Sequence, residues 1–447
     1  MKTIRLSLHL LLVPGLLALS GCAGVPTGQP EPVSPTQPGG GGEARPAEAQ
    51  IVRSDQPRVD NPQVSQQDLA ALSGGNAAFA FDLYRTLRGQ EGNLFFSPYS
   101  ISVALAMTYA GAVGDTASQM ASAMHFDLAP EGLHPAFNAV SQALAAQPEQ
   151  APDGTPFELS IANSLWGQQD FGFQPAFLDV LAQNYGAGLR LVDFAADPEA
   201  ARLAINDWVS DETRDKIRDL IPAGVLDALT RLVLANAVYF KASWLYPFAV
   251  EETASEPFYR LDGSAVDVPM MSQSESFGYS LGDGYAAIQL PYQGAEVSML
   301  LILPDEGQFE AIESQLDASM IDTILGELSY GQVELSLPRW TNETSFELNT
   351  ALQSLGMVDA FDGDRADFSG MTGARDLFIG AVLHKAFVAV DEVGTEAAAA
   401  TAVVMKLTSA PIGEPFVFRA DRPFLYLIHD GQTGSVLFLG RVVNPAG

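Results

Sequence analysis

Two predicted β-strands flank residues 392–411, EVGTEAAAATAVVMKLTSAP, and this segment limits the folds open to the chain more than any other stretch does. The alternating apolar residues of 382–391 predict the first strand, and residues 414–427 predict the second. Between them, residues 395–403 carry one charge, Glu396, and otherwise no side chain larger than Val. Such a segment can form a short helix, a linker or an additional β-strand.

The distribution of side chains along this segment fits the additional strand. In a strand, alternate residues from Thr395 to Val403 would point to one face, and Glu396 would point to the other. The first set is small enough to slide across a packed core. The pattern is therefore consistent with a segment that can enter an existing sheet.

These residues resemble the hinge of the reactive-centre loop of the serpins, the serine protease inhibitor family. Four further blocks resemble that family in the right order and spacing. They are NLFFSPYSISVALAM at 93–107, LANAVYFKASW at 234–244, LPDE at 303–306 and FRADRPFLYLI at 418–428. The resemblance covers about residues 66–445, so it concerns nearly the whole chain apart from its N-terminal segment.

Helical periodicity precedes strand periodicity along the chain. Apolar spacing predicts helices at 68–87 and 200–221, and Ser97-Pro98 opens another helix. The predicted strands are 157–166, 232–240 (buried on both faces), 286–303, 333–338, 382–390, 414–427 and 436–442. This order favours the α+β class. The resemblance implies the serpin fold, with N-terminal helices packed on a large central β-sheet, smaller sheets and an exposed reactive-centre loop.

The resemblance implies a serine-type endopeptidase inhibitor that acts as a suicide substrate, and not an enzyme. The target protease would cleave the loop and form a covalent acyl-enzyme, and the loop would then insert into the central sheet and trap the protease. One alternative is a non-inhibitory serpin that acts as a binding or chaperone module, although the small residues of 395–401 favour an inhibitor. Another is a cross-class inhibitor of a cysteine protease.

The register of the family places the scissile bond at Thr408–Ser409, with Leu407–Thr408 and Lys406–Leu407 as alternatives. Before cleavage, we expect Thr395 to lie at an exposed loop base. The resemblance further implies a hinge (Glu392, Gly394, Thr395, Glu396, Ala397, Ala398, Ala399, Ala400 and Thr401), a hydrogen-bonded shutter beneath the sheet (Ser97, Ser100, Asn236 and His384) and a breach residue (Trp244).

Residues 1–22 are typical of an export signal, with Lys2 and Arg5 ahead of an apolar stretch that is too short for a permanent membrane span. The end of this segment, Leu19-Ser20-Gly21-Cys22, resembles a bacterial lipobox, which implies that Cys22 is lipidated. An ordinary secretory signal is the alternative. Ala23 favours the outer membrane of the cell envelope by resemblance to bacterial sorting rules; an extracellular location is the other possibility.

Residues 23–65 are rich in Pro, Gly, Gln and Glu and predict a disordered tether ahead of a serpin domain at 66–447. The formal net charge of −31 argues against nucleic acid or anionic lipid as the main partner. The single Cys excludes an internal disulfide framework, and no nucleophile, metal or phosphate motif is present. We therefore expect no cofactor and no metal. The resemblance to serpins implies a target serine protease as partner, the lipobox resemblance implies a lipid-mediated contact with the membrane, and we expect a monomer.

Overall fold

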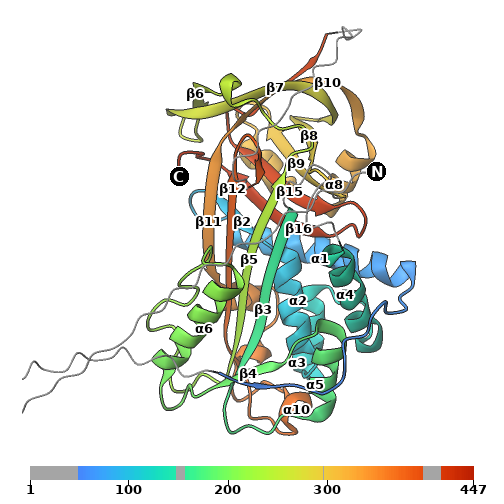
Figure 1. Cartoon of the computed structure of the whole chain (residues 1–447), viewed down its shortest axis with the longest axis vertical. Coiled ribbons are helices and arrows are strands. Elements are labelled where there is room, and N and C mark those ends of the chain that lie inside the picture. Colours follow the sequence, from blue (N-terminus) through green and yellow to red (C-terminus); the bar gives the residue numbers. More distant parts are fainter. Residues whose placement is uncertain (1–48, 147–156, 295, 396–413) are drawn as a thin grey trace, which may run out of the picture. The chain divides into compact units, whose positions relative to one another are not determined.

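The computed structural model describes residues 49–146, 157–294, 296–395 and 414–447 (Figure 1). Several predicted features lie outside these residues. They are the signal segment with Cys22, residues 23–48 of the tether, the hinge residues Glu396, Ala397, Ala398, Ala399, Ala400 and Thr401, and the scissile-bond candidates Lys406, Leu407, Thr408 and Ser409.

A seven-stranded sheet forms one layer of the described body. Its strands, in spatial order, are β1 (Gln50–Val52), β4 (Leu189–Val192), β3 (Phe157–Gln168), β5 (Leu232–Ser243), β13 (Gly394–Thr395), β12 (Ile379–Val390) and β11 (Trp340–Glu347). The two long central strands, β5 and β12, pair with each other in parallel. The short β13 is antiparallel to both of them and lies between their ends.

A nine-stranded sheet forms the second β layer. Its path runs through β14 (Phe416–Arg419), β10 (Ser329–Pro338), β7 (Ala265–Gly282), β8 (Tyr285–Pro291), β9 (Val297–Pro304), β15 (Phe424–Asp430), β16 (Val436–Val442) and β2 (Leu94–Phe96), and β6 (Ala254–Tyr259) pairs with β7. The helices with more than one turn are α1 (Gln66–Leu87), α2 (Pro98–Tyr109), α3 (Gly114–Met124), α4 (Pro130–Ala145), α5 (Pro175–Val180) with the π-helix η1 (Leu181–Tyr185), α6 (Pro198–Glu212), α7 (Phe309–Gln315), α8 (Ala318–Gly326) and α9 (Asn349–Ser354); α10 spans Ser369–Thr372. Helices and largely antiparallel sheets confirm the α+β prediction.

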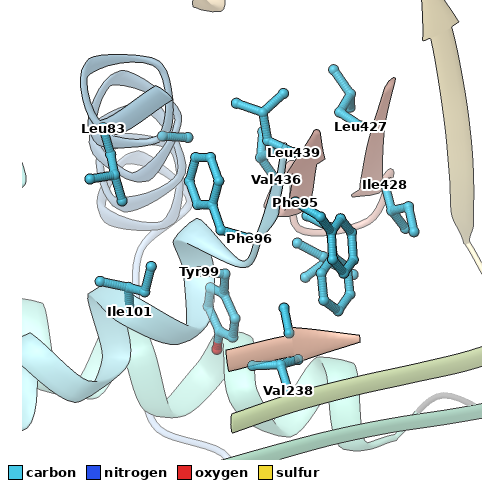
Figure 2. Close-up of a cluster of buried hydrophobic side chains, with 14 of the residues drawn as sticks. Leu83, Phe95, Phe96, Tyr99, Ile101, Val238, Leu427, Ile428, Val436 and Leu439 are labelled. Carbon is cyan, nitrogen blue, oxygen red and sulfur yellow. The ribbon is translucent and has the colours of Figure 1, made fainter. Parts of the chain in front are cut away.

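The main core lies where α1 and α2 meet both sheets (Figure 2). Phe95 of β2 stacks on Phe438 of β16 with ring centroids 5.1 Å apart, and Leu83 of α1 is fully buried nearby. β5 is buried on both faces, as predicted: Val238 belongs to this core, while Val233 packs beneath α6 on the other face. Because successive side chains alternate, one strand serves two apolar layers.

Residues 49–65 belong to the folded body, so the predicted tether of 23–65 is wrong for this stretch. β1 pairs antiparallel with β4 at the edge of the seven-stranded sheet. The backbone N–H of Val59 donates to the carbonyl oxygen of Gln183 at 2.8 Å, and Arg58 Nε donates to Asn138 Oδ1 at 2.8 Å. These contacts use mainly backbone groups, which composition does not reveal.

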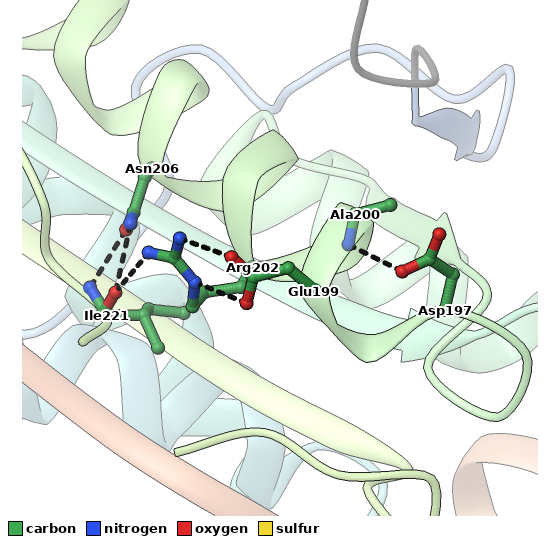
Figure 3. A network of polar contacts seen from close by, with 6 residues as sticks. All are labelled: Asp197, Glu199, Ala200, Arg202, Asn206 and Ile221. Atoms are coloured by element: carbon green, nitrogen blue, oxygen red, sulfur yellow. Dashed lines mark hydrogen bonds and ion pairs between the residues drawn. The ribbon is translucent and has the colours of Figure 1, made fainter. Parts of the chain in front are cut away.

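The helix predicted at 200–221 is shorter than expected, because α6 ends at Glu212. Arg214 and Asp215 follow with positive φ angles of 50° and 63°, which a helix cannot contain. Two polar side chains of α6 then hold the returning chain: Asn206 bonds both backbone groups of Ile221, and Arg202 Nη1 donates to the same carbonyl at 2.9 Å (Figure 3). The polar face of this helix therefore binds protein and not only water.

The strand predicted at 414–427 is two strands, β14 and β15, in the same sheet. Between them, Ala420 N–H donates to Ser336 and Tyr259 N–H donates to Asp421, after which Pro423 has no N–H to continue a ladder. None of the helices in the described ranges is both long enough and apolar enough to span a bilayer.

Candidate functional site

The hinge begins inside the seven-stranded sheet. Gly394 and Thr395 pair with Ser243 and Ala242 of β5, and Thr395 also pairs with Val390 of β12. Thr395 is 0% exposed, and its hydroxyl lies 2.7 Å from the Tyr292 hydroxyl. The expectation that Thr395 lies at an exposed loop base is therefore wrong: two residues of the segment already occupy a strand position, which periodicity alone could not reveal.

Gly394 allows the hinge to approach β5 closely. A β-carbon on Gly394 would lie 2.1 Å from the carbonyl oxygen of Ala242 and 2.7 Å from Ser243 Cα. Both contacts are with backbone, which cannot yield as a flexible side chain could. Glycine is thus required here for space between strands.

Asp391 stabilises the reversal from β12 into β13. Its Oδ1 accepts hydrogen bonds from the backbone N–H groups of Val393 (2.9 Å) and Gly394 (3.2 Å), and its own N–H donates to the Gly394 carbonyl at 2.9 Å. This is the side-chain-to-backbone turn that Asp commonly forms. Burial raises the pKa of the Asp391 carboxyl above its usual value, against the opposing effect of these hydrogen bonds.

Glu392 is a buried carboxylate that forms an ion pair with the partly exposed Arg339 at the base of the hinge. Only 3% of the residue is exposed, and its Oε1 accepts from Arg339 Nε at 2.7 Å and from Thr253 Oγ1 at 2.5 Å. Burial alone would raise the pKa of this carboxyl, but the bonds from Arg339 and Thr253 outweigh it and lower the pKa. Sequence reasoning missed both partners, because they lie 53 and 139 positions away with no shared motif.

Trp244, predicted for the breach, contacts the same turn. Its Nε1–H donates to the Asp391 carbonyl at 3.0 Å, and its backbone N–H donates to the Val393 carbonyl at 2.9 Å. The indole stacks on Tyr292, with ring centroids 4.6 Å apart and an interplanar angle of 12°. Trp244 thus packs against Tyr292, whose hydroxyl is the hydrogen-bond partner of Thr395.

The four predicted shutter residues come together in the middle of the sheet. His384 Nε2 accepts from the backbone N–H of Ser97 at 3.1 Å, and His384 Nδ1 bonds Asn236 Oδ1. Asn236 Nδ2 donates to Ser100 Oγ at 2.5 Å. Ser97 contributes its side chain elsewhere, since its Oγ caps α2 by accepting from the Ser100 N–H at 3.2 Å.

Asn163 of β3 is a fifth member of this cluster that the sequence did not identify. It lies directly opposite Asn236 in the β3–β5 ladder, accepts a hydrogen bond from the Asn236 amide, and donates to the Ser100 carbonyl at 3.1 Å. Asn163, Asn236 and His384 thus form one polar row across three strands. The available signal was a polar residue in the strand predicted at 157–166.

Burial lowers the pKa of His384 to about 3, so the imidazole is neutral at physiological pH. With Asn236 Oδ1 on Nδ1 and the Ser97 N–H on Nε2, the proton must reside on Nδ1. The His384–Asn236 bond joins β12 to β5 six residues along β5 from Ala242, where β13 pairs. An extension of β13 by about six residues between these strands would reach that bond and must break it.

Within the described ranges, no group of three or more His, Cys, Asp or Glu side chains is placed to hold a metal ion. The site consists of a strand end paired within the sheet, an ion pair with a buried carboxylate at its base, and a hydrogen-bonded row of side chains that joins the strands further along β5. Such an arrangement can hold or release a strand.

Comparison with known proteins gives a consistent result. A family model described as Serpin (serine protease inhibitor) matches residues 74–445. Human leukocyte elastase inhibitor is 40% identical over 385 residues, which cover 84% of this chain and 99% of that protein. Among solved structures, the thermophilic serpin tengpin in its native state has a TM-score of 0.78 at 28% identity and covers 89% of this chain and 100% of its own. Human thyroxine-binding globulin in complex with thyroxine has a TM-score of 0.76 at 31% identity and covers 85% of this chain and 99% of its own.

Proposed function

The chain belongs to the serpin family, and from that membership we propose that it inhibits a serine-type endopeptidase as a suicide substrate. In this proposal it is not an enzyme: the protease cleaves the segment that follows Thr395, remains bound as an acyl-enzyme, and is trapped when that segment extends β13 through the sheet. The position of β13 between β5 and β12 is the observation that supports the proposal most directly.

The strand directions give the insertion a driving force. β5 and β12 pair in parallel from Leu232↔Ile379 to Tyr239↔Phe387, whereas β13 is antiparallel to both. Insertion would replace one parallel pairing by two antiparallel ones, which are somewhat more stable per residue. About a dozen inserted residues at roughly 0.5–1.5 kcal/mol per hydrogen bond give on the order of 10 kcal/mol, comparable to the stability of a domain. A kinetic barrier must then preserve the uncleaved form.

The family also includes proteins that are named for other roles, such as thyroxine-binding globulin. A non-inhibitory binding or chaperone role is therefore the alternative function. The residues of 395–401, small apart from Glu396, favour the inhibitor, because the side chains that continue on the face of Thr395 would have to pack against the apolar core. A cysteine protease could be trapped by the same loop, since it too forms an acyl-enzyme.

The test is incubation of the purified chain with elastase-, subtilisin-, chymotrypsin- and trypsin-like proteases and with a papain-like protease. We expect an SDS-stable complex with one serine protease, and mass spectrometry of the released C-terminal peptide should identify the cleaved bond among Thr408–Ser409, Leu407–Thr408 and Lys406–Leu407. Cleavage without any stable complex across the panel would support the non-inhibitory alternative. A complex with the papain-like enzyme alone would assign the cross-class function.

We further propose that Cys22 is lipidated and that the protein is exported and anchored in the cell envelope, in the outer membrane, as a monomer. The support is the lipobox-like end of the signal segment and Ala23 after it. Metabolic labelling with a fatty-acid analogue should mark the wild-type protein and not Cys22→Ala. Unlabelled wild-type protein in the culture medium would indicate an ordinary secretory signal.

A further inference from the structure

Arg190 of β4 lies on the face of the seven-stranded sheet that α6 covers. It is directly opposite Trp166 in the β3–β4 ladder, so the two side chains share that face. Trp166 is fully buried in the smaller apolar core beneath α6, and Trp208 of α6 packs against the same core. The Arg190 Cζ atom lies 4.8 Å from the ring centroid of Trp208 and 5.5 Å from that of Trp166. The guanidinium thus connects the helix to the sheet through two cation–π contacts.

The polar N–H groups of these three side chains have no acceptor in the part of the chain that the structure describes. A guanidinium carries five N–H donors and no acceptor, and that of Arg190 forms neither a hydrogen bond nor an ion pair with a described residue. The indole Nε1 atoms of Trp166 and Trp208 are buried and likewise have no partner there. Since an indole N–H can only donate, three donor-only groups meet at one place.

An acceptor from outside the chain would satisfy these donors. Buried N–H groups in folded proteins nearly always have a partner, so several orphan donors in contact with one another point to a bound acceptor. The planar fork of a guanidinium matches the paired oxygens of a carboxylate or a phosphate.

The charges around Arg190 favour a monoanion over a dianion. Burial lowers the pKa of Arg190, and the negative charge of Glu212 at the end of α6 opposes this effect. The chain as a whole carries a formal charge of −31. Because repulsion grows with the charge of the ligand, a carboxylate fits this site better than a doubly charged phosphate.

We propose that Arg190, Trp166 and Trp208 bind a small monocarboxylate, whose oxygens accept hydrogen bonds from the guanidinium and from the indole N–H groups. Since Trp208 belongs to α6 and the other two residues belong to the sheet, the bound carboxylate would join the helix to the sheet. None of the three residues belongs to the hinge or the shutter, so binding does not depend on whether the chain inhibits a protease.

The experiment is a titration of the intact chain in which sodium acetate replaces sodium chloride at constant ionic strength, followed by NMR of the ¹⁵N-labelled indole groups. The chain has four Trp residues, and Trp→Phe variants assign their signals. We expect the N–H signals of Trp166 and Trp208 to shift downfield saturably as they gain an acceptor. The signal of Trp244 is the internal control and should not move, because its N–H already donates to the Asp391 carbonyl at 3.0 Å.

Substitutions of charged residues test the contribution of the guanidinium. Arg190→Gln should weaken acetate binding at least about tenfold. The matched control is Arg85→Gln, which makes the same change of charge on α1, where the Arg85 side chain is 45% exposed. This control should bind acetate as the wild type does. Glu212→Gln should bind acetate more tightly than the wild type, because it removes the opposing charge.

Two further measurements complete the test. Acetamide has nearly the shape of acetate without its charge, and it should not shift the two indole signals. Circular dichroism checks each fold, and Arg190→Lys, which keeps the charge but loses the fork, should also weaken binding if Arg190→Gln does not fold. The proposal is overturned by the absence of a saturable shift with acetate, by equal shifts with acetamide, or by equal acetate binding in Arg190→Gln and Arg85→Gln.

Discussion

Both ring nitrogens of His384 are engaged by hydrogen bonds that only the neutral imidazole can form together. Nδ1–H donates to Asn236, and Nε2 accepts from the Ser97 N–H. Protonation would place a second N–H at Nε2, opposite the N–H of Ser97. The closed pairing of β5 with β12 therefore depends on the protonation state of one buried side chain.

We expect acidification to destabilise the native protein through His384. Its folded pKa of about 3 lies below the ordinary value of 6.5, so the unfolded chain binds more protons between these values. The stabilising contribution is complete above pH 6.5 and is lost as pH falls towards 3; at full extent it is on the order of 5 kcal/mol. Thermal unfolding between pH 7 and pH 4 should therefore show a steeper loss for wild type than for His384→Gln.

The control is Ser118→Ala, an exposed and non-titratable position of α3 outside the shutter. It should keep the wild-type dependence on pH. The buried His134 and His429, whose pKa values burial lowers to about 4, remain in every variant and cancel in the comparison. Identical slopes for wild type and His384→Gln would contradict the role of this imidazole.

Gly394→Ala should expel the hinge from the sheet. The new methyl group would collide with the Ala242 carbonyl, so β13 must leave or β5 must shift, at a cost of about 1–3 kcal/mol. Hydrogen–deuterium exchange should increase at Thr395, and the unfolding temperature should fall. Gly89→Ala, where the β-carbon meets nothing within 4 Å, should change neither quantity. Unchanged exchange at Thr395 would show that glycine is not needed there.

β13 fixes which face of the inserting segment must be small. Thr395 points towards Tyr292 in the main core, so continued alternation would place Ala397 on that core side and Ala398 on the opposite side. Ala397→Arg should convert the proposed inhibitor into a substrate. Insertion would bury an unpaired charge, which costs several kcal/mol. Each 1.4 kcal/mol or so added to the insertion barrier slows trapping of the protease about tenfold.

Glu396→Arg is the matched control for this prediction: residue 396 already carries a charge and would lie opposite Lys241, the one β5 residue that is not fully buried, so this variant should retain much more of the SDS-stable complex. The measurement is the ratio of trapped complex to cleaved inhibitor at fixed protease. Equal partition for the two arginine variants would argue against insertion in the register of β13. Thr395→Arg is unsuitable as a probe, because an Arg at this buried position would destabilise the uncleaved native state as well as the inserted state.

Local sequence was sufficient for some parts of this site and insufficient for others. The helix start at Ser97 and the strand around Asn236 each have a signature within a few residues, and the structure brings both to His384. Arg339, Thr253 and Asn163 do not, because each acquires its role from a partner on another strand. The pairing of β1 with β4 and the burial of Thr395 against β5 likewise depend on residues far away in the sequence, and the periodicity of a single sequence does not encode such pairing.

Cleavage of the loop should stabilise the molecule as a whole. If the segment after Thr395 enters the sheet, its backbone groups gain partners on both β5 and β12, with the energy estimated above. Limited proteolysis between residues 403 and 409, followed by calorimetry, should raise the unfolding temperature clearly. Ala397→Arg, cleaved in the same way, should gain much less. A cleaved wild type that unfolds at or below the temperature of the intact protein would exclude insertion.

β1 lies at the end of the sheet far from the hinge. It pairs with β4, which joins β3 at Leu165–Gln168, opposite the start of β5, whereas β13 meets the last residues of β5. Eleven strand residues at about 3.3 Å each separate the two ends by roughly 35 Å. If Cys22 is lipidated as proposed, the lipid-bearing segment and the reactive segment join the sheet at opposite ends, and full insertion would carry the captured enzyme towards the end at which β1 pairs. The length of chain between Cys22 and β1 would then decide whether the captured enzyme has clearance above the membrane.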